Sequence, residues 1–210
     1  MEKKSIWAPQ YNKTDARWLR QDVVHEGFLR LVKGQLSFRT FRGDTVVVER
    51  ELVQPSPAVA VLPYDPWSDR VVLLEQVRPG CVANAASPWL LEVVAGLIDA
   101  GETASDAAPR ELYEETGLTA RYWLPMHRYW VSPGGSDEQV TLSCALIDST
   151  DLQPWQGNTL DDEDIKCHAL TRAQALQCVA DGVICNGAGL IALQWLALHG
   201  DRIMNQYRGV

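Results

Sequence analysis

Residues 96–118 have the sequence GLIDAGETASDAAPRELYEETGL, and this segment carries most of the structural information in the chain. Its middle part predicts a helix over about residues 104–116, which Gly117 would end because glycine readily adopts the left-handed conformation of a C-cap. On that helix Glu111 and Glu115 are four residues apart and share a face, and Glu114 lies beside it. The segment therefore gathers three carboxylates on about one and a half helical turns.

Such a cluster is unfavourable without a cation. Like charges at this spacing repel each other, and the carboxyl end of a helix disfavours negative charge. Mg²⁺ prefers carboxylate, carbonyl and water oxygens and commonly keeps phosphate as a further ligand. Gly96 permits unusual backbone geometry, so a main-chain carbonyl near Ala95 could face the metal, and Arg110 could pair with Glu102. The alternative interpretation is a solvated acidic helix end.

The segments around this helix predict an α/β layered sandwich with a mixed sheet. The run AVAVL at 58–62 suits a strand buried on both faces, and other strands are expected at 70–78, 89–96, 121–130 and 138–147. Two further helices are expected, one capped by Thr171 and reaching about residue 181, and one over about 187–199, ended by Gly200.

The first 55 residues differ from the rest, and we divide the chain into a domain of residues 1–55 and a domain of residues 56–210. Short strands at 28–33, 35–41 and 46–50 predict a small antiparallel meander. So few strands bury little surface on their own, so the meander needs a partner surface.

Composition excludes several classes of protein. A formal charge of −8 disfavours binding of nucleic acid. Apolar runs are far too short for a transmembrane helix, and no secretory signal is visible at the start. The five cysteines are scattered and odd in number, which predicts reduced thiols in a cytoplasmic protein.

The whole pattern in residues 96–118 resembles the Nudix box. Glycine, five residues, glutamate, seven residues, Arg-Glu, an apolar residue, any residue, Glu-Glu, any residue, glycine and an apolar residue are all matched. The segments around residues 58–78, 88–96, 132–135 and 191–196 resemble the bacterial ADP-ribose pyrophosphatase branch of the Nudix hydrolases. The resemblance covers about residues 56–199 well and the first 55 residues loosely. It implies a Nudix α/β/α sandwich with a mixed sheet, preceded by the N-terminal meander.

The resemblance also implies roles for individual residues around the metal ions. Two or more Mg²⁺ ions, with Mn²⁺ as an alternative, would bind the carboxylates of Glu111, Glu115 and Glu163 and the carbonyl of Ala95. Glu114 and Arg110 would complete the catalytic set. Asp161 would be the general base that deprotonates water, with Asp162 as its competitor.

Substrate contacts are implied in the same way. Arg78 would hold a phosphate through its forked donors, and Leu97 would contribute its main chain. Ser132, Pro133 and Gly134 would line the ribose side, with Glu138 near the reacting phosphates. In this branch the N-terminal meander crosses onto the partner of a homodimer. The adenine contacts would therefore be shared between subunits, and the residues expected to make them are Phe28, Leu29, Arg50 and Glu51.

The expected activity is hydrolysis of ADP-ribose to AMP and ribose 5-phosphate. A second hypothesis keeps the mechanism but changes the substrate to ADP-glucose, GDP-mannose or a related nucleoside diphosphate sugar. A third is a non-catalytic domain that senses ADP-ribose, but such a protein should have lost box carboxylates.

Pro109 departs from a regular helix, so either the helix begins late or it is distorted there, and residues 111–115 should remain helical.

Overall fold

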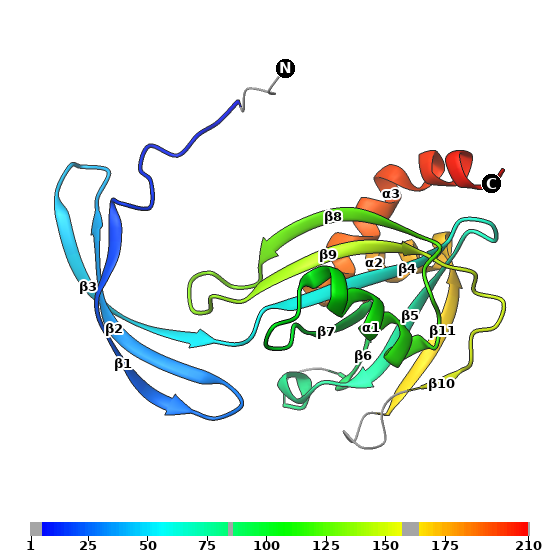
Figure 1. The fold of residues 1–210 in the computed structure, drawn as a ribbon, viewed down its shortest axis with the longest axis horizontal. Helices are drawn as coiled ribbons and strands as arrows, with labels where there is room; N and C mark the ends of the chain where they lie inside the picture. The colour runs from blue at the N-terminus through cyan, green and yellow to red at the C-terminus, as the bar shows by residue number, and fades with distance from the viewer. Residues whose placement is uncertain (1–5, 84–85, 157–163, 210) are drawn as a thin grey trace. The chain divides into compact units, whose positions relative to one another are not determined.

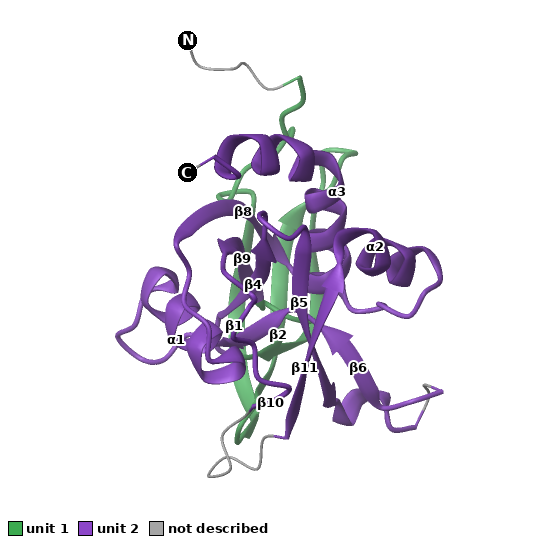
Figure 2. Cartoon of the chain, turned by 90° about the vertical axis from the view of Figure 1, so that its right-hand side faces the viewer, with its two compact units in different colours: residues 1–55, 132–138 green, residues 56–131, 139–210 purple. Residues whose placement is uncertain are grey.

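The computed structural model describes residues 6–83, 86–156 and 164–209 and consists of two compact units (Figure 2). The first unit comprises Met1–Pro55 together with Ser132–Glu138, and the second comprises Ser56–Val131 and Gln139–Val210. The segment Ser132–Glu138 therefore belongs to the first unit, although the strands on both sides of it belong to the second.

The first unit is an antiparallel three-stranded sheet in the order β1-β2-β3, so the expected meander is confirmed. The strand limits differ from those expected: residues 28–33 and 35–41 contribute to one strand, and another strand precedes it. Gly34 lies in the middle of that strand because a Cβ there would overlap the carbonyl of Arg20 on the neighbouring strand. The strands are β1 (Ala16–Glu26), β2 (Arg30–Arg39) and β3 (Thr45–Gln54).

The second unit is built on a mixed sheet in the order β10-β11-β5-β4-β9-β8, in which β6 also pairs with β5 and β7 with β4 (Figure 1). The pairing of β4 with β9 is parallel, and the other described pairings are antiparallel. The single strand expected over residues 89–96 is divided, because its two halves pair with different neighbours. The strands are β4 (Ala58–Asp65), β5 (Arg70–Val77), β6 (Trp89–Glu92), β7 (Val94–Leu97), β8 (Tyr122–Trp130), β9 (Gln139–Leu146), β10 (Trp155–Gln156) and β11 (Ile165–Thr171).

Helices cover both faces of this sheet, as the α/β/α prediction requires. Helix α1 (Ala104–Thr116) packs on one face, and α2 (Arg172–Ala180) and α3 (Gly187–Tyr207) pack on the other. A short 3₁₀ helix, η1 (Pro79–Cys81), follows β5. Strand β4 is buried along its whole length, because Val59 and Val61 belong to the core beside α1, whereas Ala60 and Leu62 belong to the core beside α2 and α3.

The helix ends test the expectations drawn from glycine and threonine. Gly117 ends α1 with a φ of 69°, and the amide of Gln174 donates to the hydroxyl of Thr171 over 3.2 Å at the start of α2. The predicted end of α3 was wrong, because the helix continues through Gly200 to Tyr207. Gly200 instead provides room for a neighbouring side chain, since a Cβ there would lie 2.5 Å from Nη1 of Arg172.

Helix α1 begins at Ala104 and contains Pro109 in its interior, which excludes a late start. Residues 111–115 are helical, as predicted. The chain tolerates an interior proline here because the helix is capped before it and packed on the sheet through Ala107, Ala108 and Leu112.

Candidate active site

The start of α1 is fixed by the residues that precede it. The amide of Thr103 donates to Oδ2 of Asp106 over 3.1 Å, and the Thr103 hydroxyl donates to the same oxygen. The hydrogen bond from the Thr103 side chain lowers the pKa of Asp106. The aspartate is therefore charged in the first turn, where the helix dipole favours negative charge.

Arg110 connects the acidic residues of α1 to the loop before the helix. Its Nε and Nη2 donate to the two carboxylate oxygens of Glu102 over 3.0 and 2.9 Å, which confirms the expected pair. Its Nη1 donates to Glu111 over 2.8 Å and to Glu114 over 3.0 Å, and Nη2 also donates to the carbonyl of Leu97 over 3.1 Å. One guanidinium thus uses its planar fork to hold five acceptors.

This cluster shifts the pKa values of its members in opposite directions. The hydrogen bond to Glu102, followed by the contacts with Glu111 and Glu114, raises the pKa of Arg110. The same hydrogen bond lowers the pKa of Glu102. Both side chains are therefore charged at neutral pH, and the loop stays attached to the helix through an ion pair.

The carboxylates of α1 lie directly against β7. The amide of Ala95 donates to Oε2 of Glu115 over 3.1 Å, and Glu115 is only 4% exposed. At Gly96 an added Cβ would overlap the carboxylate of Glu111. The glycine is therefore required by close approach, and the Glu111 carboxylate occupies the space that any other residue would fill.

This geometry fits a hard divalent cation in its donor chemistry. The carboxylates of Glu111 and Glu115 bring oxygen atoms to the side of α1 that faces β7, and oxygen is the ligand type that Mg²⁺ prefers. Within the described residues, no group of three or more histidine, cysteine, aspartate or glutamate side chains is arranged to hold a metal. Asp161, Asp162 and Glu163, which the sequence suggested as base and last ligand, lie outside the described residues.

Arg78 directly follows β5, and the structure gives it a partner that the sequence did not suggest. Its Nε donates over 2.6 Å to Oε2 of Glu92, a residue that is only 9% exposed. Strands β5 and β6 pair Leu74 with Glu92, and Leu74 belongs to the core beside α1. Because alternate residues of a strand share a face, Arg78 and Glu92 lie on the α1 side of the sheet.

The remaining candidate residues lie in the first unit. Phe28 is 88% exposed and Leu29 is 46% exposed in the turn between β1 and β2. Arg50 and Glu51 are exposed on β3, and Nη1 of Arg50 donates to the carbonyl of Glu49. These four residues therefore belong to the first unit, and the two apolar ones, Phe28 and Leu29, are exposed.

The Ser132–Glu138 segment is held by the end of β3. The amide of Val53 donates to the carbonyl of Gly135 over 2.9 Å, the amide of Asp137 donates to the carbonyl of Val53 over 3.2 Å, and Nε2 of Gln54 donates to Asp137 over 2.9 Å. The amide of Glu138 donates to the Ser136 hydroxyl over 3.1 Å. The segment therefore brings Ser132, Pro133, Gly134 and Glu138 into the same unit as Phe28 and Arg50.

Comparison with known proteins identifies the class to which this fold and acidic helix belong. The NUDIX domain model matches residues 54–181, and the chain is a member of the Nudix family. The N-terminal part of the first unit lies almost wholly outside the matched range, whereas its second piece, Ser132–Glu138, lies within it.

Individual relatives resemble the chain over nearly its whole length. It is 37% identical over 198 residues to the ADP-ribose pyrophosphatase of Escherichia coli K12, covering 94% of this chain and 95% of that protein. It is also 37% identical over 202 residues to that of Haemophilus influenzae, covering 94% and 93%. A GDP-mannose pyrophosphatase of Yersinia pestis is 31% identical over 183 residues, covering 85% and 89%. A crystal structure of an ADP compounds hydrolase shares the fold, with a TM-score of 0.66, 22% identity and coverage of 92% and 97%.

Proposed function

We propose that this protein hydrolyses the pyrophosphate bond of ADP-ribose to give AMP and ribose 5-phosphate. The observation that carries the proposal is 37% identity to ADP-ribose pyrophosphatases over 94% of the chain, which includes N-terminal residues outside the Nudix match. The complete set of box carboxylates on α1 supports a catalytic protein over a domain that only senses ADP-ribose.

The proposed metal ion is Mg²⁺, with Mn²⁺ as an alternative, in two or more copies. Glu111, Glu115, the carbonyl of Ala95 and Glu163 would hold it. Bound there, a divalent cation neutralises charge on the phosphoryl oxygens and lowers the pKa of a bound water. Arg110 would position Glu111 and Glu114 through the contacts described above.

The proposed reaction requires one base and one positioned diphosphate. Asp161, or its neighbour Asp162, would accept a proton from water as the water oxygen forms a bond to phosphorus. The bond from that phosphorus to the bridging oxygen breaks, and the bridging oxygen leaves on the other phosphate. Arg78 would bind a phosphate with its terminal nitrogens, because Glu92 engages its Nε.

The first unit is proposed to supply the adenine and ribose contacts in a homodimer. It exposes apolar side chains, including Leu19 and Val23 on β1 and Phe28 in the turn after it, and so small a sheet needs a further surface for stability. Phe28, Leu29, Arg50 and Glu51 would contact the base, Ser132, Pro133 and Gly134 the ribose, and Glu138 the region near the phosphates. Leu97 would contribute main-chain contact. Sedimentation equilibrium that gave only monomer at micromolar concentration would contradict the shared site.

A cytoplasmic location is part of the same proposal. All five cysteines are free thiols in the structure, which suits a reducing compartment. No helix among the described residues is both long and apolar enough to cross a membrane.

Hydrolysis of another nucleoside diphosphate sugar is the alternative, and the relative that acts on GDP-mannose supports it. The deciding experiment is a phosphatase-coupled phosphate-release panel with Mg²⁺ over ADP-ribose, ADP-glucose, GDP-mannose, NADH and diadenosine polyphosphates. We expect the highest kcat/KM for ADP-ribose. A higher kcat/KM for GDP-mannose would make GDP-mannose the proposed substrate. If no substrate were hydrolysed with either Mg²⁺ or Mn²⁺, the proposal that the protein is an enzyme would be refuted.

A further inference from the structure

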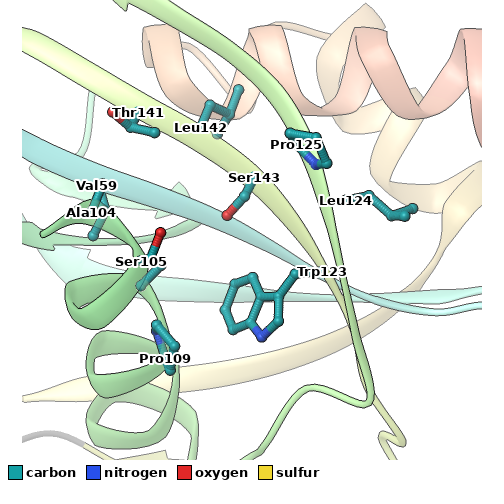
Figure 3. A pocket seen from close by; sticks show the side chains of 11 residues that line it. Val59, Ala104, Ser105, Pro109, Trp123, Leu124, Pro125, Thr141, Leu142 and Ser143 are labelled. Atoms are coloured by element: carbon teal, nitrogen blue, oxygen red, sulfur yellow. The ribbon is translucent and has the colours of Figure 1, made fainter.

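A cavity of about 370 Å³ lies in the second unit beside α1, on the side of strands β8 and β9 (Figure 3). Helix α1 packs over β4 and β7, and β8 is the last strand in the described order of the sheet. The helix therefore leaves this edge of the sheet face open. The volume falls within the range of small-molecule sites, which is roughly 300–1,000 Å³.

The cavity exists because small side chains line it. Ala104, Ser105, Ala108 and Pro109 form one side of α1, since residues three or four positions apart lie together on a helix. Had these been leucines, they would have filled the space against the sheet. The short side chains on this side of α1 thus leave the cavity between the helix and the sheet.

The opposite wall is shaped by an irregularity in β8. The register with β9 shifts between Pro125 and His127, and such bulges redirect the side chains near them. Trp123, which is 37% exposed, places its indole ring at the cavity, and Ser143 on β9 directs its hydroxyl into it (Figure 3). One wall of the cavity is therefore aromatic.

The polar side chains at the cavity are uncharged, and Pro109 interrupts the hydrogen bonding of the helix beside them. None of the described lining residues carries a charge. In a regular helix the carbonyl of Ser105 would accept a hydrogen bond from the amide of residue 109, but Pro109 has no N–H. The interruption in helix hydrogen bonding therefore falls at two lining residues, beside the hydroxyl of Ser105.

We propose that this cavity binds an uncharged, planar heteroaromatic compound that has an N–H group. The ring stacks on Trp123 between apolar walls, and the N–H donates to the carbonyl of Ser105. A charged compound is disfavoured because its desolvation would not be compensated. Glu111, Glu115 and Arg78 are not among the lining residues, so the site is separate from the proposed site of hydrolysis and does not depend on that proposal.

The test is calorimetric titration of the full chain with indole and with 1-methylindole, in EDTA so that no hydrolysis occurs. We expect saturable binding of indole and weaker binding of 1-methylindole, which has no N–H. Trp123→Leu should weaken indole binding about tenfold, the scale of a lost aromatic contact. The matched control is Trp130→Leu, which removes a tryptophan from the same strand outside the cavity and should leave binding unchanged.

A second variant tests the hydrogen bond. Pro109→Ala restores a backbone N–H that can donate to the carbonyl of Ser105 within the helix. Because alanine also favours the helix, the variant should fold. It should no longer prefer indole to 1-methylindole, since the carbonyl is already occupied. Absence of saturable binding, equal losses in the two tryptophan variants, or equal affinity for both indoles would overturn the proposal. So would a preference retained in Pro109→Ala, or competitive displacement of indole by ADP-ribose.

Discussion

The substitution Gly96→Ala separates the stability of the protein from its activity. Backbone conformation does not forbid alanine, because the φ of Gly96 is outside the left-handed region. The three atoms nearest to the added Cβ all belong to the carboxylate of Glu111, which is the far end of a flexible side chain. The free energy of unfolding should therefore change by less than about 1 kcal/mol, since replacing glycine also restricts the unfolded chain.

Activity should respond very differently. To reach van der Waals contact, the Glu111 carboxylate must retreat from Cβ by about 1.5 Å, and a displacement of about 1 Å in a catalytic site already costs about 100-fold in rate. We expect kcat/KM for ADP-ribose with Mg²⁺ to fall by about 100-fold or more, while the midpoint of urea unfolding is nearly unchanged. The matched control is Gly80→Ala, because nothing lies within 4 Å of a Cβ added there. Wild-type kcat/KM in Gly96→Ala would refute the assigned role of Glu111.

Four further predictions concern charged groups. Glu115→Gln should abolish turnover while circular dichroism and the unfolding midpoint show a folded protein; unchanged turnover would remove the enzyme hypothesis. Arg110→Lys should lower kcat/KM by about tenfold or more because the fork is lost, whereas Arg20→Lys, at an exposed ion pair, should have no effect. Since Arg110 lowers the pKa of Glu102, their pairing stabilises the fold above the ordinary glutamate pKa and is lost as pH falls through the folded value; unfolding midpoints of wild type and Arg110→Lys should converge in acid. Asp65→Ala should lower the free energy of unfolding by about 2–3 kcal/mol in urea titrations, because its buried carboxylate accepts hydrogen bonds from Ser68 and Ser149; a loss below about 0.5 kcal/mol would contradict this.

The features that sequence reasoning recovered are those whose cause is local. Gly117 ends α1 and Thr171 caps α2 through interactions within a few residues. The apolar run in β4 was correctly expected to be buried on both faces. The pair between Arg110 and Glu102 was found because both residues belong to one short motif.

The features that it missed depend on neighbours that are distant in the chain. Gly34 suggested a break between two strands, but it makes room for the carbonyl of Arg20 on β1. Gly200 suggested the end of a helix, but it makes room for the side chain of Arg172 on α2. The division between β6 and β7 follows from two different partner strands. The contact of Arg78 with Glu92 required the register of β5 and β6, which no pattern in a single strand reveals.

The way in which the chain passes between the two units has a practical consequence for protein engineering. Because Ser132–Glu138 belongs with the N-terminal sheet, the polypeptide crosses the boundary at three places. Deleting the first 55 residues would remove the end of β3, to which Ser132–Glu138 is hydrogen-bonded. Transferring those 55 residues alone to another hydrolase would carry over only part of the unit. A functional exchange therefore has to move both pieces together, as one discontinuous cassette.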